Sequence, residues 1–432
     1  MRLTKSIFSI ALCILLLLGT VCVGNAEEIV TIRAAWWGGT ARNDMMNEIY
    51  DLYESEHPNV TIEREYGSWE DYWIRYSTQV AGGNAPDLIQ FTDRELASYV
   101  GMGAVEPLTS YVEDGTIDVS QFSQSALSAG TLDGVLYEIA MGLSTPIIQY
   151  NATAIEAAGM PLPEMEMTWD ELKNYLIDLK NTGKLPEGMY AIYDEGGVNG
   201  AFHWFYSYMR QKGEDWWTAD GTLGFTQETV EEWLSWWDEL RDEGIVLPYD
   251  RVAEFIGKPK EENPLVMGAV AMHSVAGNQA KIYQNNMEDE TGIIRLPSLP
   301  NGANEHGEVI AGAYLAISST SKHKEVVADI INFFVNDERA NKIFNCEQGI
   351  YGNVAMQQAV ADQIDPLDLI VTDVLNITLE SIPMPAPYPS GSETVITLLQ
   401  DTNEFVAYDV MSIEDAAKQF MTEVENVFRN AA

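Results

Sequence analysis

The stretch that decides the fold is residues 29–91, which read IVTIRAAWWGGTARNDMMNEIYDLYESEHPNVTIEREYGSWEDYWIRYSTQVAGGNAPDLIQF. Residues 29–34 alternate apolar and polar side chains, which predicts a strand. Residues 60–65 and 87–91 are predicted as the second and third strands. The three strands are separated by segments long enough to hold a helix each.

Those two intervening segments carry helical signals. Residues 44–56 place Met45, Ile49, Leu52 and Tyr53 at helical spacing, and a proline after this run ends the helix. Residues 70–79 form the second helix, which ends at a Gly-Gly turn. An order of βαβαβ predicts a mostly parallel sheet covered by helices.

The carboxyl ends of such strands are where ligands collect. Trp36, Trp37 and Arg42 follow the first predicted strand, and Asp93 follows the third. We therefore expect these side chains on one rim of the sheet, where a ligand would lie.

The first 26 residues have the pattern of a secretory leader. Arg2 and Lys5 precede an apolar run over 7–23, and small residues at 24–26 favour cleavage after Ala26. Two alternatives stay open, namely retention of the leader as a membrane anchor and lipid attachment at Cys22. No later stretch is long and apolar enough to span a membrane.

The composition describes an acidic chain of 432 residues, enough for two domains. The leader holds two of the 24 basic residues and no acid, so its removal leaves 22 basic against 66 acidic residues, a formal charge of −44. Such a surface repels nucleic acid and anionic membranes, and solubility is its simplest explanation. Cys346 is the only cysteine after the leader, which excludes an intramolecular disulfide and predicts a small buried apolar residue.

Four further helices are predicted along the chain. Residues 169–181 begin with Thr168 as N-cap and Glu171 three positions later, which is a capping box. Thr226 caps a second helix over 226–243. Apolar spacing predicts two more, over 324–336 and 412–430.

Six short segments, in this order, resemble one family. They are AGGNAPD at 81–87, GMGAVEPL at 101–108, GVLYEIA at 134–140, YN at 150–151 with AG at 158–159, TWDEL at 168–172, and GIYGN at 349–353. Together they make the chain similar to the extracellular solute-binding proteins of sugar ABC transporters, family 1, the maltose-binding-protein-like group. The resemblance covers essentially the whole mature chain. Tyr351-Gly352 departs from it, because relatives often have proline there.

The resemblance implies an α/β architecture, the two-lobed periplasmic-binding-protein type 2 fold, with discontinuous lobes and a hinge. Lobe one is expected over 27–140 plus 318–376, and lobe two over 143–315 plus 382–432. The hinge crossings are expected near 140–143, 314–318 and 376–382.

The implied function is that of a substrate-binding receptor of an ABC importer, in the periplasm or at the cell surface. It would capture a carbohydrate, an oligosaccharide, between the lobes and deliver it to the membrane permease subunits by hinge closure. No cofactor, no nucleic acid, no catalysis and a monomer are expected.

Sugar capture needs aromatic rings for the apolar faces of a pyranose and polar groups for its hydroxyls. The chain supplies 11 Trp and 20 Tyr. Trp37 is preferred to Trp36 as the ligand contact, and Arg42 is balanced between a ligand and a nearby acid. Trp233, Trp236 and Trp237 lie at helical spacing and are predicted as core. The candidate ligand-binding residues are Trp36, Trp37, Arg42, Trp69, Asp93, Asp194, Trp204, Asn278, Gly312, Tyr314, Tyr351 and Tyr388.

Other chemistries lack their motifs. The five histidines show no metal-ligand spacing, and neither a G-x-S-x-G elbow nor a phosphate-binding loop is present. The rival class is a secreted glycoside hydrolase or polysaccharide lyase that uses paired carboxylates. With 66 acidic residues the abundance of carboxylates decides nothing.

Overall fold

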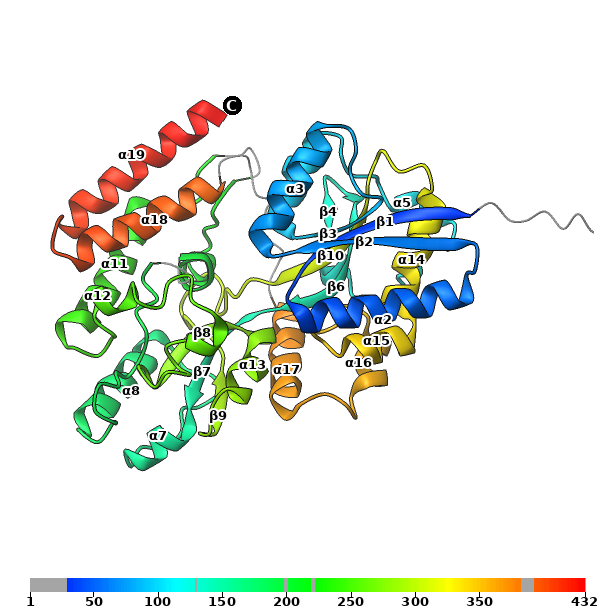
Figure 1. Ribbon diagram of the computed structural model, residues 1–432. Coiled ribbons are helices and arrows are strands. Elements are labelled where there is room, and N and C mark those ends of the chain that lie inside the picture. Colours follow the sequence, from blue (N-terminus) through cyan, green and yellow to red (C-terminus); the bar gives the residue numbers. More distant parts are fainter. Residues whose placement is uncertain (1–28, 129, 198–200, 219–221, 382–391, 432) are drawn as a thin grey trace, which may run out of the picture.

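Two sheets, each surrounded by helices, divide the molecule into two lobes (Figure 1). The computed structural model describes residues 29–431 apart from 129, 198–200, 219–221 and 382–391. The first lobe holds a five-stranded sheet and the second a three-stranded sheet. This mixed α/β, two-lobed architecture confirms the predicted fold class.

The sheet of lobe one has the order β2-β1-β3-β10-β6. Its strands are β1 (Val30–Trp37), β2 (Val60–Gly67), β3 (Leu88–Phe91), β6 (Glu138–Ser144) and β10 (Ala311–Ile317). As predicted, β1 runs parallel to β2 and β3. Strand β10 runs antiparallel to both β3 and β6. A late segment of the chain therefore lies between two earlier strands in this sheet.

Helices cover both faces of this sheet. They are α2 (Thr40–Glu56), α3 (Trp69–Ala81), α4 (Asp93–Gly101), α14 (Lys324–Asn336) and α15 (Glu338–Phe344). Helix α2 begins four residues earlier than predicted, directly after the Gly38-Gly39 pair. Smaller elements complete the lobe, namely α5 (Thr109–Glu113), α6 (Gln124–Ser128), β4 (Thr131–Leu132), β5 (Val135–Leu136) and α16 (Val354–Val360).

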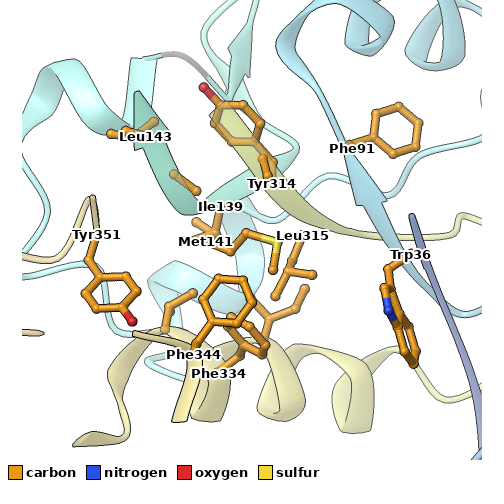
Figure 2. Close-up of a cluster of buried hydrophobic side chains, with 14 of the residues drawn as sticks. Trp36, Phe91, Ile139, Met141, Leu143, Tyr314, Leu315, Phe334, Phe344 and Tyr351 are labelled. Atoms are coloured by element: carbon orange, nitrogen blue, oxygen red, sulfur yellow. The ribbon is translucent and has the colours of Figure 1, made fainter. Parts of the chain in front are cut away.

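The core of lobe one lies between the sheet and these helices. Figure 2 shows Trp36, Phe91 and Leu315 from the strands, with Phe334 and Phe344 from α14 and α15. Apolar burial of this kind is the main stabilising term of a fold without disulfides. Cys346 is buried at 7% exposure and forms no disulfide, as predicted.

Lobe two is built on the antiparallel sheet β8-β7-β9. Its strands are β7 (Pro146–Asn151), β8 (Met272–Ala276) and β9 (Thr291–Ile294). Its helical elements are α7 (Ala152–Ala157), α8 (Trp169–Asn181), η1 (Ala201–Phe205), α10 (Tyr206–Gln211), α11 (Gln227–Asp242), α12 (Tyr249–Val252), η2 (Lys260–Glu262), η3 (Gly277–Gln279), α13 (Ala280–Asn285), α18 (Ser392–Ala407) and α19 (Ile413–Ala431).

The predicted helix starts of this lobe are confirmed. Thr168 Oγ1 accepts from the backbone N of Glu171 at 3.2 Å, and the Glu171 carboxylate accepts from Thr168 N at 2.8 Å, which is a complete capping box. Thr226 caps α11 in the same way at Thr229 N. Of the α11 tryptophans predicted as core, Trp233 and Trp237 are buried and Trp236 is partly buried.

The lobes are joined where β6 leads into β7. Strand β6 stays paired with β10 as far as Ser144, and β7 begins at Pro146, so Thr145 alone separates the two sheets. Helix α17 (Pro366–Ser381) packs against β6 of lobe one and against α13 and β9 of lobe two. Among the described residues, none of the helices combines the length and the apolarity needed to cross a membrane.

Candidate functional site

Three strand ends of lobe one point toward lobe two. Strand β1 ends at Trp37, β2 at Gly67 and β3 at Phe91, and each is followed by the first turn of α2, α3 or α4. Figure 1 shows the beginnings of α2 and α3 on the side of lobe one that faces the second lobe. This edge is the rim that the sequence predicts as the ligand side.

Trp36 and Trp37 project from opposite faces of β1, as expected for adjacent strand residues. The Trp36 indole is fully buried, and its Nε1 donates to Asn43 Oδ1 at 2.9 Å. Trp37 is 8% exposed and packs edge-on against Trp69, with ring centres 5.0 Å apart. Trp36 is therefore a core residue. Trp37 is the buried member of an aromatic cluster that it forms with Trp69, Tyr72 and Trp73.

Two rings are exposed at this rim: Trp69 belongs to the Trp37 cluster, and Tyr66 packs against Trp36 on the other face of β1, with ring centres 5.0 Å apart. Trp69, the first residue of α3, is 38% exposed, and Tyr66 near the end of β2 is 43% exposed. Ser68 caps α3 by accepting from Asp71 N at 3.2 Å, which fixes the direction in which the helix leaves the strand. Lobe one thus presents aromatic surface at its rim through Trp69 and Tyr66.

Arg42 forms an ion pair rather than pointing freely outward. Its Nε donates to Glu347 Oε2 at 2.6 Å, its Nη2 donates to Glu347 Oε1 at 3.1 Å, and its Nη1 donates to the carbonyl of Trp37 at 3.0 Å. The partner is not one of the nearby acids considered from sequence, because α15 brings Glu347 to the start of α2. Arg42 therefore ties the β1 rim to the segment after α15.

A cavity of about 360 Å³ opens on lobe two. This volume falls in the range of ordinary ligand pockets. We call it the basic pocket; it is lined by Tyr193, His203, Phe255, Ile256, Gly257, Lys258, Pro259, Lys260, Asn263, Pro264, His273, Ser274, Val275, Ala276, Gln279 and Tyr283. Aromatic rings, amides and cationic side chains thus share one wall.

A buried carboxylate organises the floor of the basic pocket. Glu195 is 1% exposed, and its Oε1 lies 2.7 Å from His273 Nδ1 and accepts from Ser274 N at 2.7 Å. Within the described part of the chain, Glu195 Oε2 and Ser274 Oγ have no hydrogen-bond partner. Buried polar atoms are rarely left in that state, so a solute or water is expected to satisfy them.

Charges from lobe one reach this pocket. Burial lowers the pKa of Lys260, and the Arg42 guanidinium lowers it further, whereas the carboxylates of Glu347 and Glu261 act in the opposite direction. Burial also lowers the pKa of His203 to about 4, with a smaller contribution from Arg94 on α4. Because Arg42 and Arg94 belong to lobe one, the basic pocket faces the rim across the gap between the lobes.

Two predicted site residues belong to the interior of lobe two. The Asp194 carboxylate is fully buried and receives Arg241 Nε at 2.7 Å and Gly196 N at 2.9 Å. Trp204 is fully buried between Trp169 and Trp237. In this conformation neither offers a surface to a ligand, because packing and ion pairing already occupy them.

Two predicted tyrosines are likewise internal. The Tyr351 hydroxyl donates to the carbonyl of Asn341 at 2.6 Å and accepts from Cys346 N at 2.9 Å, so this ring holds its own loop against the end of α15. Tyr314 is fully buried in β10 between Phe91 and Ala140. Both residues are structural here.

The remaining candidates lie near the lobe junction or outside the described atoms. Asn278 donates its backbone N to Ser144 Oγ at 3.2 Å, and Gly312 pairs with Leu143 in the β10–β6 ladder. Asp93 is the first residue of α4, and its side chain is not described. Tyr388 lies outside the described residues.

The pocket residues that the sequence did not single out lie in η2 and directly after it, in β8 and in α13. Lys260, Asn263, His273 and Tyr283 have no motif that marks them. The one available signal was the pair Lys258 and Lys260 in a chain with few basic residues. Across the described residues, no cluster of histidines, cysteines and acids is arranged to hold a metal ion.

Comparisons with known proteins agree with this geometry. A family model described as bacterial extracellular solute-binding protein matches residues 48–367. A putative binding protein of Brucella abortus is 27% identical over 297 residues, which is 68% of this chain and 69% of that protein.

Two solved structures extend the comparison. A family 1 extracellular solute-binding protein from Alicyclobacillus acidocaldarius superposes with a TM-score of 0.74 at 25% identity, over 93% of this chain and 99% of that one. A periplasmic oligogalacturonide-binding protein from Yersinia enterocolitica, solved with saturated digalacturonic acid, gives a TM-score of 0.78 over 93% of this chain and 99% of its own. At 23% identity the latter shows a shared fold alone.

Proposed function

The chain belongs to the family of bacterial extracellular solute-binding proteins, and from that premise we propose that it captures a carbohydrate between its lobes and delivers it to the permease of an ABC importer. The observation that carries the proposal is the basic pocket of about 360 Å³ on lobe two, facing the aromatic rim of lobe one. We further propose that the receptor acts as a monomer outside the cytoplasmic membrane, after export by its leader.

The two walls of the gap supply what a sugar requires. Trp69 and Tyr66 are exposed on lobe one, and Tyr193, Phe255 and Tyr283 line the pocket of lobe two. Flat rings pack against the C–H faces of a pyranose, while amides and charged groups bind its hydroxyls. Among the predicted residues, Trp69 is therefore the one we retain as a stacking platform, with Trp37 beneath it.

The hinge positions are also proposed. The first crossing is placed at residues 144–146 rather than 140–143, because β6 stays in the lobe-one sheet through Ser144. The second is placed just before Ala311 rather than at 314–318, since β10 is paired in the same sheet over its full length. The third crossing, expected near 376–382, stays a prediction, because α17 is continuous over Pro366–Ser381 and residue 382 lies outside the described residues.

Binding without catalysis is part of the proposal. A glycoside hydrolase needs two carboxylates that flank the scissile bond. Among the described residues, the lining of the basic pocket contains neither aspartate nor glutamate, and the nearby Glu195 already engages His273 and Ser274.

A thermal-shift screen over neutral and acidic oligosaccharides, followed by calorimetry on the hits, tests the proposed function. A ligand that binds only the folded state raises the apparent stability, by about 2.7 kcal/mol at a hundred times its dissociation constant. Saturable binding with no release of reducing sugar is expected. Sustained release of reducing sugar would show that the protein is a hydrolase. An unchanged unfolding temperature with every saccharide would reject a carbohydrate as the ligand.

A further inference from the structure

The basic pocket departs from the composition of the chain. Acidic residues outnumber lysines and arginines by 66 to 24 over the whole sequence. The pocket lining nevertheless contains two lysines and two histidines, and within the described chain it contains no aspartate or glutamate. A wall with this bias is suited to negative charge, because its lining combines donors with cationic groups, and the Glu195 carboxylate beneath it is engaged by His273 and Ser274.

Lys260 is the cation in this pocket that has no counter-charge bound to it. Lys258, two residues earlier, lies 3.5 Å from Glu262. Lys260 is half-buried, and its ammonium makes no hydrogen bond or ion pair with any residue that the structure describes. A partly buried cation without a partner is stabilised by an anion beside it. The Lys260 ammonium is not among the fully enclosed polar atoms of the described chain, so an anion that enters the pocket can reach it.

Arg42 on lobe one adds further positive charge near Lys260. Arg42 lies close enough for its charge to act on Lys260, while its own donors are occupied by Glu347 and the carbonyl of Trp37. Glu347 is thus shared between an arginine that it already pairs with and a lysine that it only approaches. An anion between the lobes would neutralise Lys260 and favour closure of the gap.

Uncharged donors are present around the same position. They belong to Asn263, Ser274 and Gln279 in the pocket lining, whereas the Tyr283 hydroxyl already donates to Gln279 Oε1 at 2.5 Å. Hydrogen bonds to an ionised acceptor are stronger than those to a neutral one. The pocket therefore offers an oxyanion one cation and several neutral donors, beside the aromatic rings that hold a sugar.

We propose that the solute carries an anionic group, the carboxylate of a uronic-acid saccharide, and that Lys260 is its charge partner in the basic pocket. This inference rests on the proposed function, since it names the class of carbohydrate that the gap accepts. A phosphate ester presents the same oxyanion chemistry, and the test separates the two sources.

The experiment compares ligands and variants by calorimetry. The probes are digalacturonate, its dimethyl ester, which has the same rings without charge, and glycerol phosphate. The proteins are the full mature chain, Lys260→Gln, and Lys418→Gln as the control. Lys418 is exposed on α19, so its substitution makes the same change in net charge at a distance from the pocket.

The expected result is that the wild-type protein and Lys418→Gln bind digalacturonate at least roughly tenfold more tightly than its ester, the usual size of a charge-assisted contact. Lys260→Gln should lose that preference and still bind the ester. Tight binding of glycerol phosphate that disappears in Lys260→Gln would support the anion site and assign its source to a phosphate.

Equal affinities of the wild-type protein for the acid and the ester would overturn the inference. An unchanged preference in Lys260→Gln would overturn it as well. Binding of neutral saccharides alone would sink the anionic site and leave the carbohydrate receptor intact. Failure of every saccharide in the screen would instead reject the proposed function, so the two failures are distinguishable.

Discussion

Asp194 illustrates how a residue that resembles a ligand contact can belong to the scaffold. Its carboxylate is fully buried, and Arg241, which is 11% exposed, also donates to Asn403 Oδ1 at 2.8 Å. The pair therefore joins the segment after residue 193 to α11 and α18. A buried ion is tolerated only while its partners remain in place.

We predict that Asp194→Asn lowers the free energy of unfolding by about 3–5 kcal/mol, the usual cost of breaking a buried ion pair. The solute affinity of the protein that remains folded should not change. Chemical denaturation and calorimetry measure the two quantities. Asp242→Asn, at an exposed position at the end of α11, is the control, and an equal effect of both variants would contradict the assignment.

The pKa of the His203 imidazole differs between the folded and the unfolded chain. The pKa of its imidazole is lowered to about 4 in the folded protein, against about 6.5 in an unfolded chain. The unfolded state therefore takes up the proton first as the pH falls. This group contributes a loss of stability that begins below about pH 6.5 and is complete once the pH is below the folded pKa.

The wild-type protein loses stability as the pH falls from 7.5 to 4. We predict that this loss is smaller by roughly 2–3 kcal/mol in His203→Gln, because the imidazole that causes part of it is gone. Urea denaturation at a series of pH values gives the two curves. Parallel curves for His203→Gln would show that the buried imidazole is not responsible.

At the scale of elements, the close approach between β6 and the segment after α15 depends on one glycine. Gly349 has a φ of +121°, and a Cβ built on it would lie 2.3 Å from the carbonyl oxygen of Leu143. On the next residue, Ile350 exchanges backbone hydrogen bonds of 2.7 Å in both directions with Leu143. The bridge fixes the segment that also carries Glu347, the partner of Arg42.

We predict that Gly349→Ala lowers the free energy of unfolding by roughly 2 kcal/mol or more, since it adds backbone strain and a steric clash. Gly101→Ala is the matched control, because a Cβ there meets nothing within 4 Å at the end of α4. That substitution should be neutral or slightly stabilising. Equal unfolding midpoints for the two variants would show that the bridge tolerates a side chain.

At the scale of the whole molecule, two electrostatic interactions act across the gap between the lobes. Arg42 acts on Lys260, and Arg94 acts on His203, so in this conformation the rim of lobe one lies near the basic pocket. The crossing at Thr145 is short, which suits a hinge. Closure around a solute would bury the exposed ring of Trp69.

We predict that a saturating saccharide compacts the protein and changes its tryptophan fluorescence. Small-angle X-ray scattering of the protein, refolded to remove any retained solute, should give a smaller radius of gyration after the ligand is added. Trp69→Ala should bind the same saccharide more weakly, by about 1–3 kcal/mol for a lost aromatic contact. Identical scattering curves with and without ligand would exclude hinge closure.

The sequence by itself determined the elements whose signals are local. The capping box at Thr168 and the βαβαβ order of residues 29–91 were readable because helix and strand periods and cap hydrogen bonds involve neighbouring residues. The ordered segments also identified the family, and the leader gave an expectation for the compartment.

Only the tertiary structure decided which of these side chains are interior and which form the site. Arg42 meets Glu347 across 305 positions of the chain, and Asp194 meets Arg241 across 47. Lys260 becomes a candidate for anion binding only because lobe one approaches it in the folded protein. Burial and charge pairing depend on segments that are distant along the chain, so no local pattern contains them. The sequence therefore indicated a receptor, and the fold formed the basic pocket in which we propose that the solute binds.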